Sequence, residues 1–299
     1  MRFGVREICN VVFKATVANQ RVGAKEFAKG QPVIYFDSLK TSTMEQAVTT
    51  VYAQGGRGNT RLVAWDGEKT LTFTMEDALI SEMGLAILAS AKLYKAGDAE
   101  DPNGSGNGTD NTLIVHVTET INADGDLTLT KTSTNKNGVQ AYVLPLDENG
   151  EIMGAAVTAT ITGTTLTEPS FGDDVTESAI KGYLVDYYYE VKSGATQIDI
   201  EPENFGGNFY IEADTLFRDT NGKDHAAQFV IPNGKVQSNF TLTMASSGDP
   251  STFTFTVDAF PGYVNGDLTK KVMAAIQILG DEVVAGIDDA AGDDDTPIA

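Results

Sequence analysis

The stretch "FTLTMASSGDPSTFTFTVDAFPGY", residues 240–263, indicates the fold class of the chain. Apolar residues alternate with polar ones on both sides of an "SSGDPS" turn. This period of two is typical of strands with one buried face, so the stretch predicts a β-hairpin. The expected buried side consists of Phe240, Leu242, Met244, Phe253, Phe255 and Val257. The opposite side is rich in threonine and low in charge, and it comprises Thr241, Thr243, Thr252, Thr254 and Thr256. It is either an ordinary solvated sheet face or the lining of a contact surface.

Further β-rich runs occur along the whole chain. They include "VVFKATV", "QPVIYF", "KTLTFTM", "GYLVDYYYEV", "GNFYIEADTLF" and "AAQFVI", separated by turns in a chain with 30 glycines. The composition and the turn spacing predict a mainly β protein, a β-sandwich or half-barrel.

One amphipathic helix is expected at about residues 75–95. Thr74 is its candidate N-cap, an apolar stripe near period 3.6 begins at Leu79, and Gly97 can end it. A lone helix of this kind is expected to flank a sheet.

The chain then changes character at "AGDAEDPNGSGNGTDN", a Gly/Asn/Asp-rich linker or loop. Short strands separated by "NADG", "NKNG" and "DENG" turns follow, which predicts a small inserted β domain. The expected organisation is residues 1–96 as the first part of the main β domain, 97–111 as linker, 112–180 as inserted domain, 181–285 as the second part and 286–299 as a flexible acidic tail.

The net charge of −21 argues against a protein that grips nucleic acid, which needs a basic surface. The single cysteine, Cys9, excludes an intrachain disulfide and is expected to be a small buried side chain. Arg6 and Glu7 interrupt any signal-peptide core, and no window has the length of a membrane span. We expect synthesis in a cytoplasm and no membrane association.

No motif indicates catalysis, a cofactor or a metal. "DPNGSG", residues 101–106, resembles the start of a calcium loop, but Thr112 stands where a bidentate Glu is needed. "GGRGN" lacks the Gly-Lys-Ser/Thr ending of a phosphate loop. We interpret this run, Gly55, Gly56, Arg57, Gly58 and Asn59, as turn glycines that present an arginine at a candidate subunit interface.

Three segments together resemble major tail tube proteins of tailed bacteriophages. They are residues 30–81, the helix that follows, and residues 205–262; the strand, "SGDP" turn and strand after "IPNGK" are the most specific part. The resemblance covers about half of the chain.

The resemblance implies a tail-tube-like β-sandwich or half-barrel with one flanking helix. Six subunits would join their sheets into a closed β-barrel ring, and rings would stack into a virion tail tube that conducts DNA during ejection. It implies that the threonine side faces the lumen or a neighbouring subunit, so that DNA passes without specific binding.

The implied partners are further copies of the chain, with tail sheath, tape measure and tail terminator proteins as additional contacts. The inserted domain departs from compact tube subunits and is expected to face outward. A capsid decoration protein or another virion component is the alternative, and a hydrolase is a third hypothesis without a supporting motif.

Overall fold

The computed structural model describes residues 2–23, 25–97, 112–135, 138–173, 175–242, 244, 246–247, 252–264 and 267–279. Most of the expected linker and the whole acidic tail, 286–299, lie outside these residues, as does the calcium-like run 101–106. The strands of the first half are β1 (Phe3–Val5), β2 (Asn10–Ala15), β3 (Gln20–Val22), β4 (Lys25–Phe27), β5 (Pro32–Phe36), β6 (Leu39–Gly55), β7 (Thr60–Asp77), β8 (Lys92–Lys95), β9 (Leu113–Asn122) and β10 (Ala141–Leu146). Those of the second half are β11 (Val157–Ala159), β12 (Ile161–Thr162), β13 (Thr165–Leu166), β14 (Gly182–Val191), β15 (Thr196–Asp199), β16 (Asn208–Asp219), β17 (Asp224–Val236), β18 (Phe253–Ala259), β19 (Gly262–Tyr263), β20 (Lys271–Val272) and β21 (Ala275–Ile278). The helices are α1 (Glu82–Leu88) and one 3-10 turn, Glu177–Ala179.

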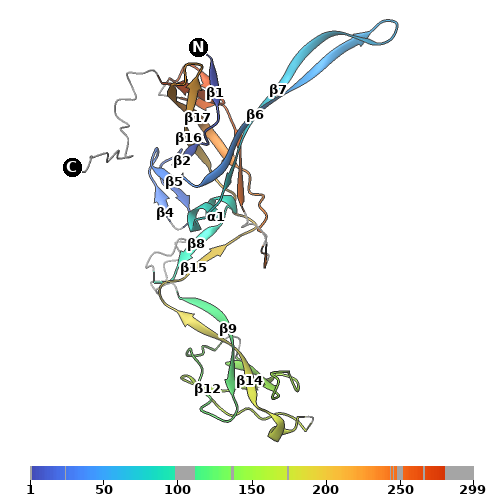
Figure 1. The fold of residues 1–299 in the computed structure, drawn as a ribbon, viewed down its shortest axis with the longest axis vertical. Coiled ribbons are helices and arrows are strands. Elements are labelled where there is room, and N and C mark those ends of the chain that lie inside the picture. Colours follow the sequence, from blue (N-terminus) through green and yellow to red (C-terminus); the bar gives the residue numbers. More distant parts are fainter. Residues whose placement is uncertain are drawn as a thin grey trace, which may run out of the picture. The chain divides into compact units, whose positions relative to one another are not determined.

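The chain forms two compact units, and the fold is mainly β (Figure 1). The first unit combines Met1–Leu93 with Ile198–Ala299, and the second is Tyr94–Gln197. The second unit thus covers a longer stretch of sequence than the expected insertion at 112–180. Its β14 extends to Val191 and pairs with β9 along its whole length, from Gly182 opposite Asn122 to Val191 opposite Leu113.

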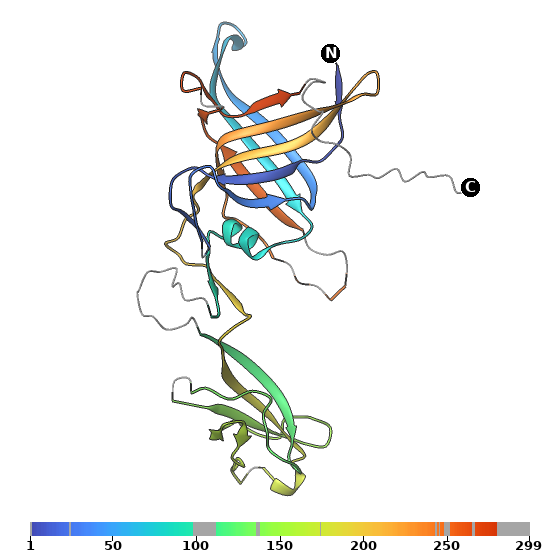
Figure 2. The same ribbon diagram turned by 90° about the vertical axis from the view of Figure 1, so that its left-hand side faces the viewer.

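The first unit is built on one nine-stranded sheet. Its main path runs β5-β2-β16-β17-β18-β7-β6, with β1 added to β16 and β21 to β17. The sheet curls strongly (Figure 2), so that Phe36 on β5, at one end of the path, contacts Phe255 on β18 with 4.9 Å between ring centroids. The two end strands, β5 and β6, are not paired with each other in the described part of the chain, so the sheet of one copy is open and not a closed barrel.

The inside of this curl holds the core. Phe13, Phe73, Met75, Phe255 and Val257 are fully buried. The aromatic rings pack edge-on or tilted, with Phe13 lying 5.3 Å from Phe36 and 5.4 Å from Phe209 between centroids. The apolar positions of "TFTFTV" and "KTLTFTM" therefore face inward, as their alternation predicts.

The predicted hairpin 240–263 is wrong in its first half. Leu242 is 45% exposed and Met244 84% exposed, and the described residues of 240–247 form no strand. β18 instead pairs with β7, from Phe253 opposite Asp77 to Asp258 opposite Thr72, and with the end of β17. One neighbour of β18, β7, is distant in sequence, and the other is the end of β17 rather than residues 240–247; local alternation could not reveal either pairing.

The prediction of a helix at about residues 75–95 is also wrong in its bounds. α1 has seven residues, Glu82–Leu88, and its N-cap is Ser81, whose hydroxyl accepts a hydrogen bond from the Gly84 amide at 3.0 Å. Thr74 lies inside β7, because the period-two run "TLTFTM" is paired on both sides. Ser90 adopts a left-handed backbone conformation just beyond the helix, and residues 92–95 form β8, which pairs with β15.

The second unit is a small domain on a four-stranded sheet of order β11-β10-β14-β9. One face packs on its own core around Val143, Val185 and Tyr187. The Tyr187 hydroxyl donates to the Glu119 carboxylate at 2.8 Å and accepts from the Lys131 amide at 3.1 Å. A tyrosine is buried there because its polar end is satisfied.

Candidate functional site

Three neighbouring strands of the first unit present a continuous face of threonines and carboxylates. Residues directly opposite each other in a sheet point to the same side, so the register defines this face. The rows are Thr254–Glu76–Thr41, Thr256–Thr74–Thr43 and Asp258–Thr72–Glu45, across β18, β7 and β6. We call these nine residues the hydroxyl-acid face. It contains no basic residue; Lys235 on β17 lies opposite Asp258 at its border.

The structure places only part of the sequence-predicted threonine set on this face. Thr254 and Thr256 belong to it, whereas Thr241 lies outside any strand and Thr252 precedes β18. Thr243 lies outside the described residues. Thr41, Thr43, Thr72 and Thr74 were missed, although the alternation in "TSTME" and "TLTFTME" carries the same signal as the predicted set.

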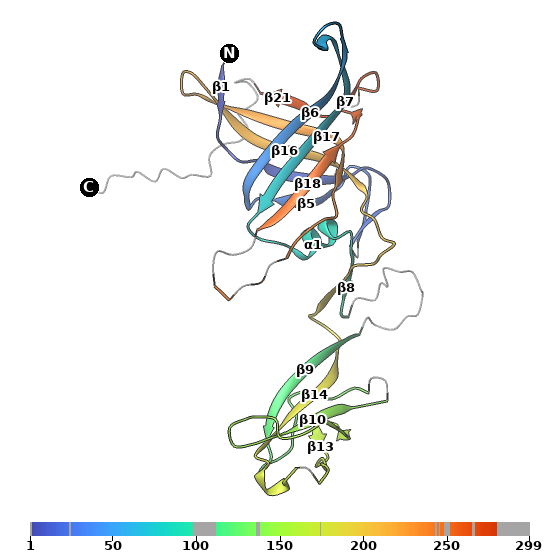
Figure 3. The ribbon, with the colours of Figure 1, turned by 90° about the vertical axis from the view of Figure 1, so that its right-hand side faces the viewer.

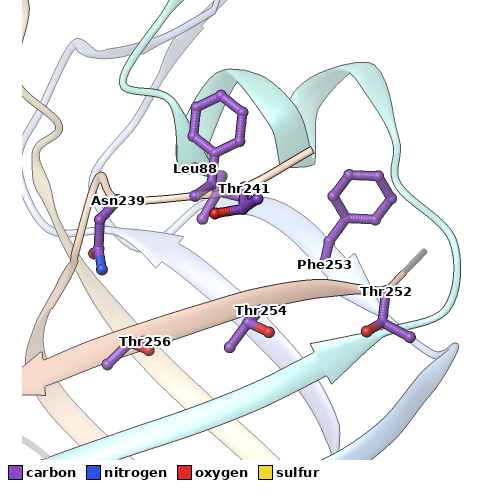
Figure 4. A pocket seen from close by; sticks show the side chains of 8 residues that line it. Leu88, Asn239, Thr241, Thr252, Phe253, Thr254 and Thr256 are labelled. Atoms are coloured by element: carbon purple, nitrogen blue, oxygen red, sulfur yellow. The ribbon is translucent and has the colours of Figure 1, made fainter. Parts of the chain in front are cut away.

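A pocket of about 480 Å³ opens beside this face, next to α1 (Figure 4). It lies at the end of β18 where Phe253 is opposite Asp77. Thr252, Thr254 and Thr256 project along one wall, and aromatic rings and Leu88 of α1 line the other side. The complete lining is Leu88, Asn239, Phe240, Thr241, Thr252, Phe253, Thr254 and Thr256.

The second feature is a long two-stranded ribbon that projects beyond the rest of the sheet (Figure 3). β7 pairs with β18 only at residues 72–77, while β6 and β7 stay paired from Leu39 and Asp77 to Gly55 and Thr60. We call residues 47–70 the arm. A bulge near Thr49 bends it: the Thr49 hydroxyl accepts a 2.8 Å hydrogen bond from the Glu68 amide, and it leaves no space for a side chain at Gly67.

The predicted interface run forms the turn at the tip of the arm. Gly56, Gly58 and Asn59 have positive φ angles of 79°, 94° and 48°, and the Asn59 amide donates to the Gly56 carbonyl at 3.2 Å. The first two positions favour glycine because a side chain there is strained. The turn holds Arg57 at the exposed tip, which suits the predicted role as a contact residue.

The arm carries exposed apolar side chains where a solvated ribbon would carry polar ones. Val51 is opposite Trp65 and Ala53 opposite Val63, so these four share one face. Trp65, the single tryptophan, is 56% exposed. Further exposed apolar residues of the arm are Val48, Tyr52 and Leu62. Such a concentration on a two-stranded ribbon marks a surface that another element covers.

The charge of the arm is opposite to that of the chain. Residues 51–65, which we call its outer half, contain Arg57 and Arg61 and no acidic residue. The Arg61 guanidinium lies 4.0 Å from the centre of the Tyr52 ring. With a net charge of −21 for the chain, the remainder carries −23.

The cysteine and the two histidines, which could in principle act in catalysis, each have a structural environment away from the hydroxyl-acid face and the arm. Burial raises the pKa of the Cys9 thiol, whose side chain packs in the core as expected. His225 lies 3.4 Å from the buried Asp219 carboxylate at the end of the β16–β17 hairpin, and His116 lies 2.7 Å from Asp186 on the second unit's sheet. Among the described residues, no group of three or more His, Cys, Asp and Glu side chains could hold a metal ion, and no helix is both long and apolar enough to span a membrane.

The mainly β fold, the hydroxyl-acid face and the exposed apolar arm are features typical of structural proteins that form assemblies. The comparison with protein families agrees with this class: residues 17–274 match the YomU/Tube protein family. The chain therefore belongs to this family and is a phage tail tube-like structural protein, a component of the virion. No curated protein matches the chain.

Proposed function

We propose that the protein is the subunit of a phage tail tube, which assembles into hexameric rings that stack around a DNA channel. The arm carries this proposal. A two-stranded ribbon is at best marginally stable alone in water, and this one exposes Val51, Leu62 and Trp65. Contact with another copy buries these side chains and explains why an acidic protein has a long, partly apolar and basic ribbon.

The hydroxyl-acid face supports the channel. DNA is a polyanion, and proteins that hold it neutralise phosphates with Lys and Arg. A wall with Glu45, Glu76 and Asp258 among threonines repels phosphates weakly and offers hydroxyl groups that keep water at the surface. DNA can then slide past without binding specifically.

Ring formation also resolves the open edges of the curled sheet. β5 and β6 end its path, and unpaired edge strands invite pairing with another chain. Joining the sheets of six copies into one closed wall satisfies these edges within the ring.

The remaining expectations follow as parts of the proposal. The second unit, Tyr94–Gln197, lies outside the tube, because a DNA channel must stay open. The subunit acts without catalysis or cofactors. It is made in the host bacterial cytoplasm, and sheath, tape measure and terminator proteins are its partners in the tail.

Electron microscopy of the purified full chain tests the proposal. Negative staining should show long straight tubes, and antibodies against the chain should label the tail of virions. Label confined to the head would favour the alternative, a capsid decoration protein. Monomers alone, with no tube in purified particles, would refute the assembly.

Arg57→Glu at the arm tip is expected to impair assembly more than folding. The side chain is exposed in one copy, so the unfolding temperature should stay within about 1 °C of wild type, as is usual for surface changes. Tube length should fall severalfold in electron micrographs. Lys181→Glu, a charge reversal at an exposed position of the second unit, is the matched control; equal tube length in both variants would contradict the role of the tip.

A further inference from the structure

The second unit has a cavity of its own, beside the C-terminal end of β14. Its volume is about 500 Å³, which lies within the usual range of small-molecule sites. All of the lining residues belong to the second unit, so one copy contains the whole cavity. We call it the β14 cavity. Its lining is Lys131, Thr132, Ser133, Thr134, Tyr189, Glu190, Val191, Lys192 and Ser193.

Residues 131–134 form one wall of the cavity, because they continue the sheet where β10 ends. β10 leaves this edge of β14 before the C-terminal end of the strand. Beyond that point, Ser133 forms an antiparallel bridge with Tyr189. The Thr134 amide donates a hydrogen bond to the Tyr188 carbonyl at 2.8 Å. The wall is therefore held in place by the sheet itself and needs no ligand to form.

Hydroxyl groups dominate the lining. Four side chains supply one each, and a hydroxyl can both donate and accept a hydrogen bond. The Tyr189 ring adds a flat apolar surface. A sugar ring presents matching features, with hydroxyl groups at its rim and C–H groups on its faces. The lining therefore suits a saccharide better than an apolar ligand. The four hydroxyl side chains are those of Thr132, Ser133, Thr134 and Ser193.

Positive charge is concentrated at this cavity. The second unit contains five lysines, no arginine and sixteen acidic residues. Two of these lysines, Lys131 and Lys192, belong to the lining, and Glu190 is the one acid of its described part. The Lys131 ammonium lies 5.9 Å from the centre of the Tyr189 ring. The Lys192 ammonium lies 3.8 Å from the Glu190 carboxylate. The local balance is thus positive within an acidic unit.

Salt decides which charges a ligand meets in the cavity. At physiological ionic strength, interactions between exposed charges fade beyond a Debye length of about 8 Å. The two lysines therefore act on a bound ligand more strongly than the acidic residues on the rest of the unit. An anionic group near Lys131, on a sugar ring that lies against Tyr189, matches both the charge and the hydroxyl groups of the lining.

We infer that the β14 cavity binds a saccharide that carries an anionic group, a carboxylate or a phosphate. The lysines pair with the anionic group, the hydroxyl side chains bond to the sugar hydroxyls, and the Tyr189 ring packs against one face of the sugar. This inference goes beyond assembly into a tube and does not depend on it, because the cavity is complete in one copy. It gives the second unit a binding role, which a tube wall does not need.

Calorimetric titration of the full chain tests the inference. The probes are glucuronic acid and glucose 6-phosphate, compared with glucose, acetate and inorganic phosphate. At least one of the two anionic sugars should bind about tenfold or more tightly than glucose and than the corresponding free anion, because only it uses both the lysines and the hydroxyl groups. Its affinity should fall as sodium chloride rises from about 0.02 M to about 0.15 M, since salt screens the lysines.

Lysine variants separate the cavity from the general charge of the unit. Lys131→Gln and Lys192→Gln should each weaken binding about threefold, the usual order for one exposed ion pair, and the double variant about tenfold. Lys181→Gln, at an exposed position of the same unit outside the cavity lining, is the matched control and should bind like wild type. All three side chains are exposed, so circular dichroism should show an unchanged fold.

The opposite results would overturn the inference. Acetate or phosphate that binds as tightly as the sugar would show a site for anions alone. Glucose that binds equally well would show that the lysines play no part. An absence of binding with every probe, or an equal loss of affinity in Lys181→Gln, would show that the cavity is not a saccharide site.

Discussion

At the residue scale, one turn in each unit is held by the same pattern of hydrogen bonds to an aspartate carboxylate. Asp147 and Asp219 each begin a turn of the form Asp-x-Asn-Gly, and each carboxylate accepts hydrogen bonds from the amides two and four residues later. Gly150 and Gly222 take the positive φ values of 78° and 85° that these turns require. The two loops are thus built alike, although they belong to different units and have different surroundings.

These bonds predict a dependence of stability on pH. The Lys223 amide first, and then the Asn221 amide and His225, hold the pKa of Asp219 below its usual value. A lowered native pKa stabilises the fold above the unfolded-state pKa of about 3.9, and this stability is lost as pH falls through the native value. Asp219→Asn should lower the free energy of unfolding at pH 7, and the difference from wild type should shrink below pH 4. A constant difference in denaturant titrations from pH 7 to 2.5 would contradict this.

At the scale of elements, β18 is held by pairing with β7 and the end of β17, and not by residues 240–247. Phe255 on β18 is fully buried against Phe36 of β5, whereas Met244 is 84% exposed. Phe255→Ala should therefore cost about 3–5 kcal/mol, the usual range for a truncated core aromatic. Met244→Ala should change stability by less than about 0.5 kcal/mol. Urea titrations of the two variants and the wild-type chain measure these free energies of unfolding. Similar losses in both variants would favour the predicted hairpin, in which Met244 is buried.

The sequence predicts strands well where alternation continues, and poorly where pairing is nonlocal. Residues 70–76 alternate as a strand, and the apolar spacing from Leu79 to Leu93 fits a helix. The sequence alone does not show where the strand ends and the helix begins. Pairing with β6 and β18 shows that β7 extends to Asp77. Likewise the glycines and Arg57 of the arm tip are visible in the sequence, but the pocket is not. Leu88, Phe240 and Phe253 meet there from three separate segments.

At the scale of the whole molecule, the two chain segments that connect the first unit with the second lie side by side. The Ala96 amide donates to the Ala195 carbonyl at 2.9 Å, and β8 pairs with β15. An Asn-Gly turn can therefore join Ala96 to Ala195 in place of residues 97–194, as in a short hairpin.

This deletion is expected to keep the first unit folded. Among the described residues, its core, around Phe13, Phe73 and Ile211, contains none that belongs to the second unit. The shortened chain should unfold in one cooperative transition and still form tubes, of smaller outer diameter in electron micrographs. A chain that no longer folds would show that the second unit stabilises the first; a folded chain without tubes would place essential assembly contacts on the second unit.

The central claim is that identical copies build a tube with the hydroxyl-acid face toward the channel. A cryo-electron microscopy reconstruction of tubes assembled from the full chain tests it most directly. We expect Thr254, Thr256 and Glu76 on the channel wall, with the arm in contact with another copy. A tube whose channel is lined by another face of the sheet would contradict it.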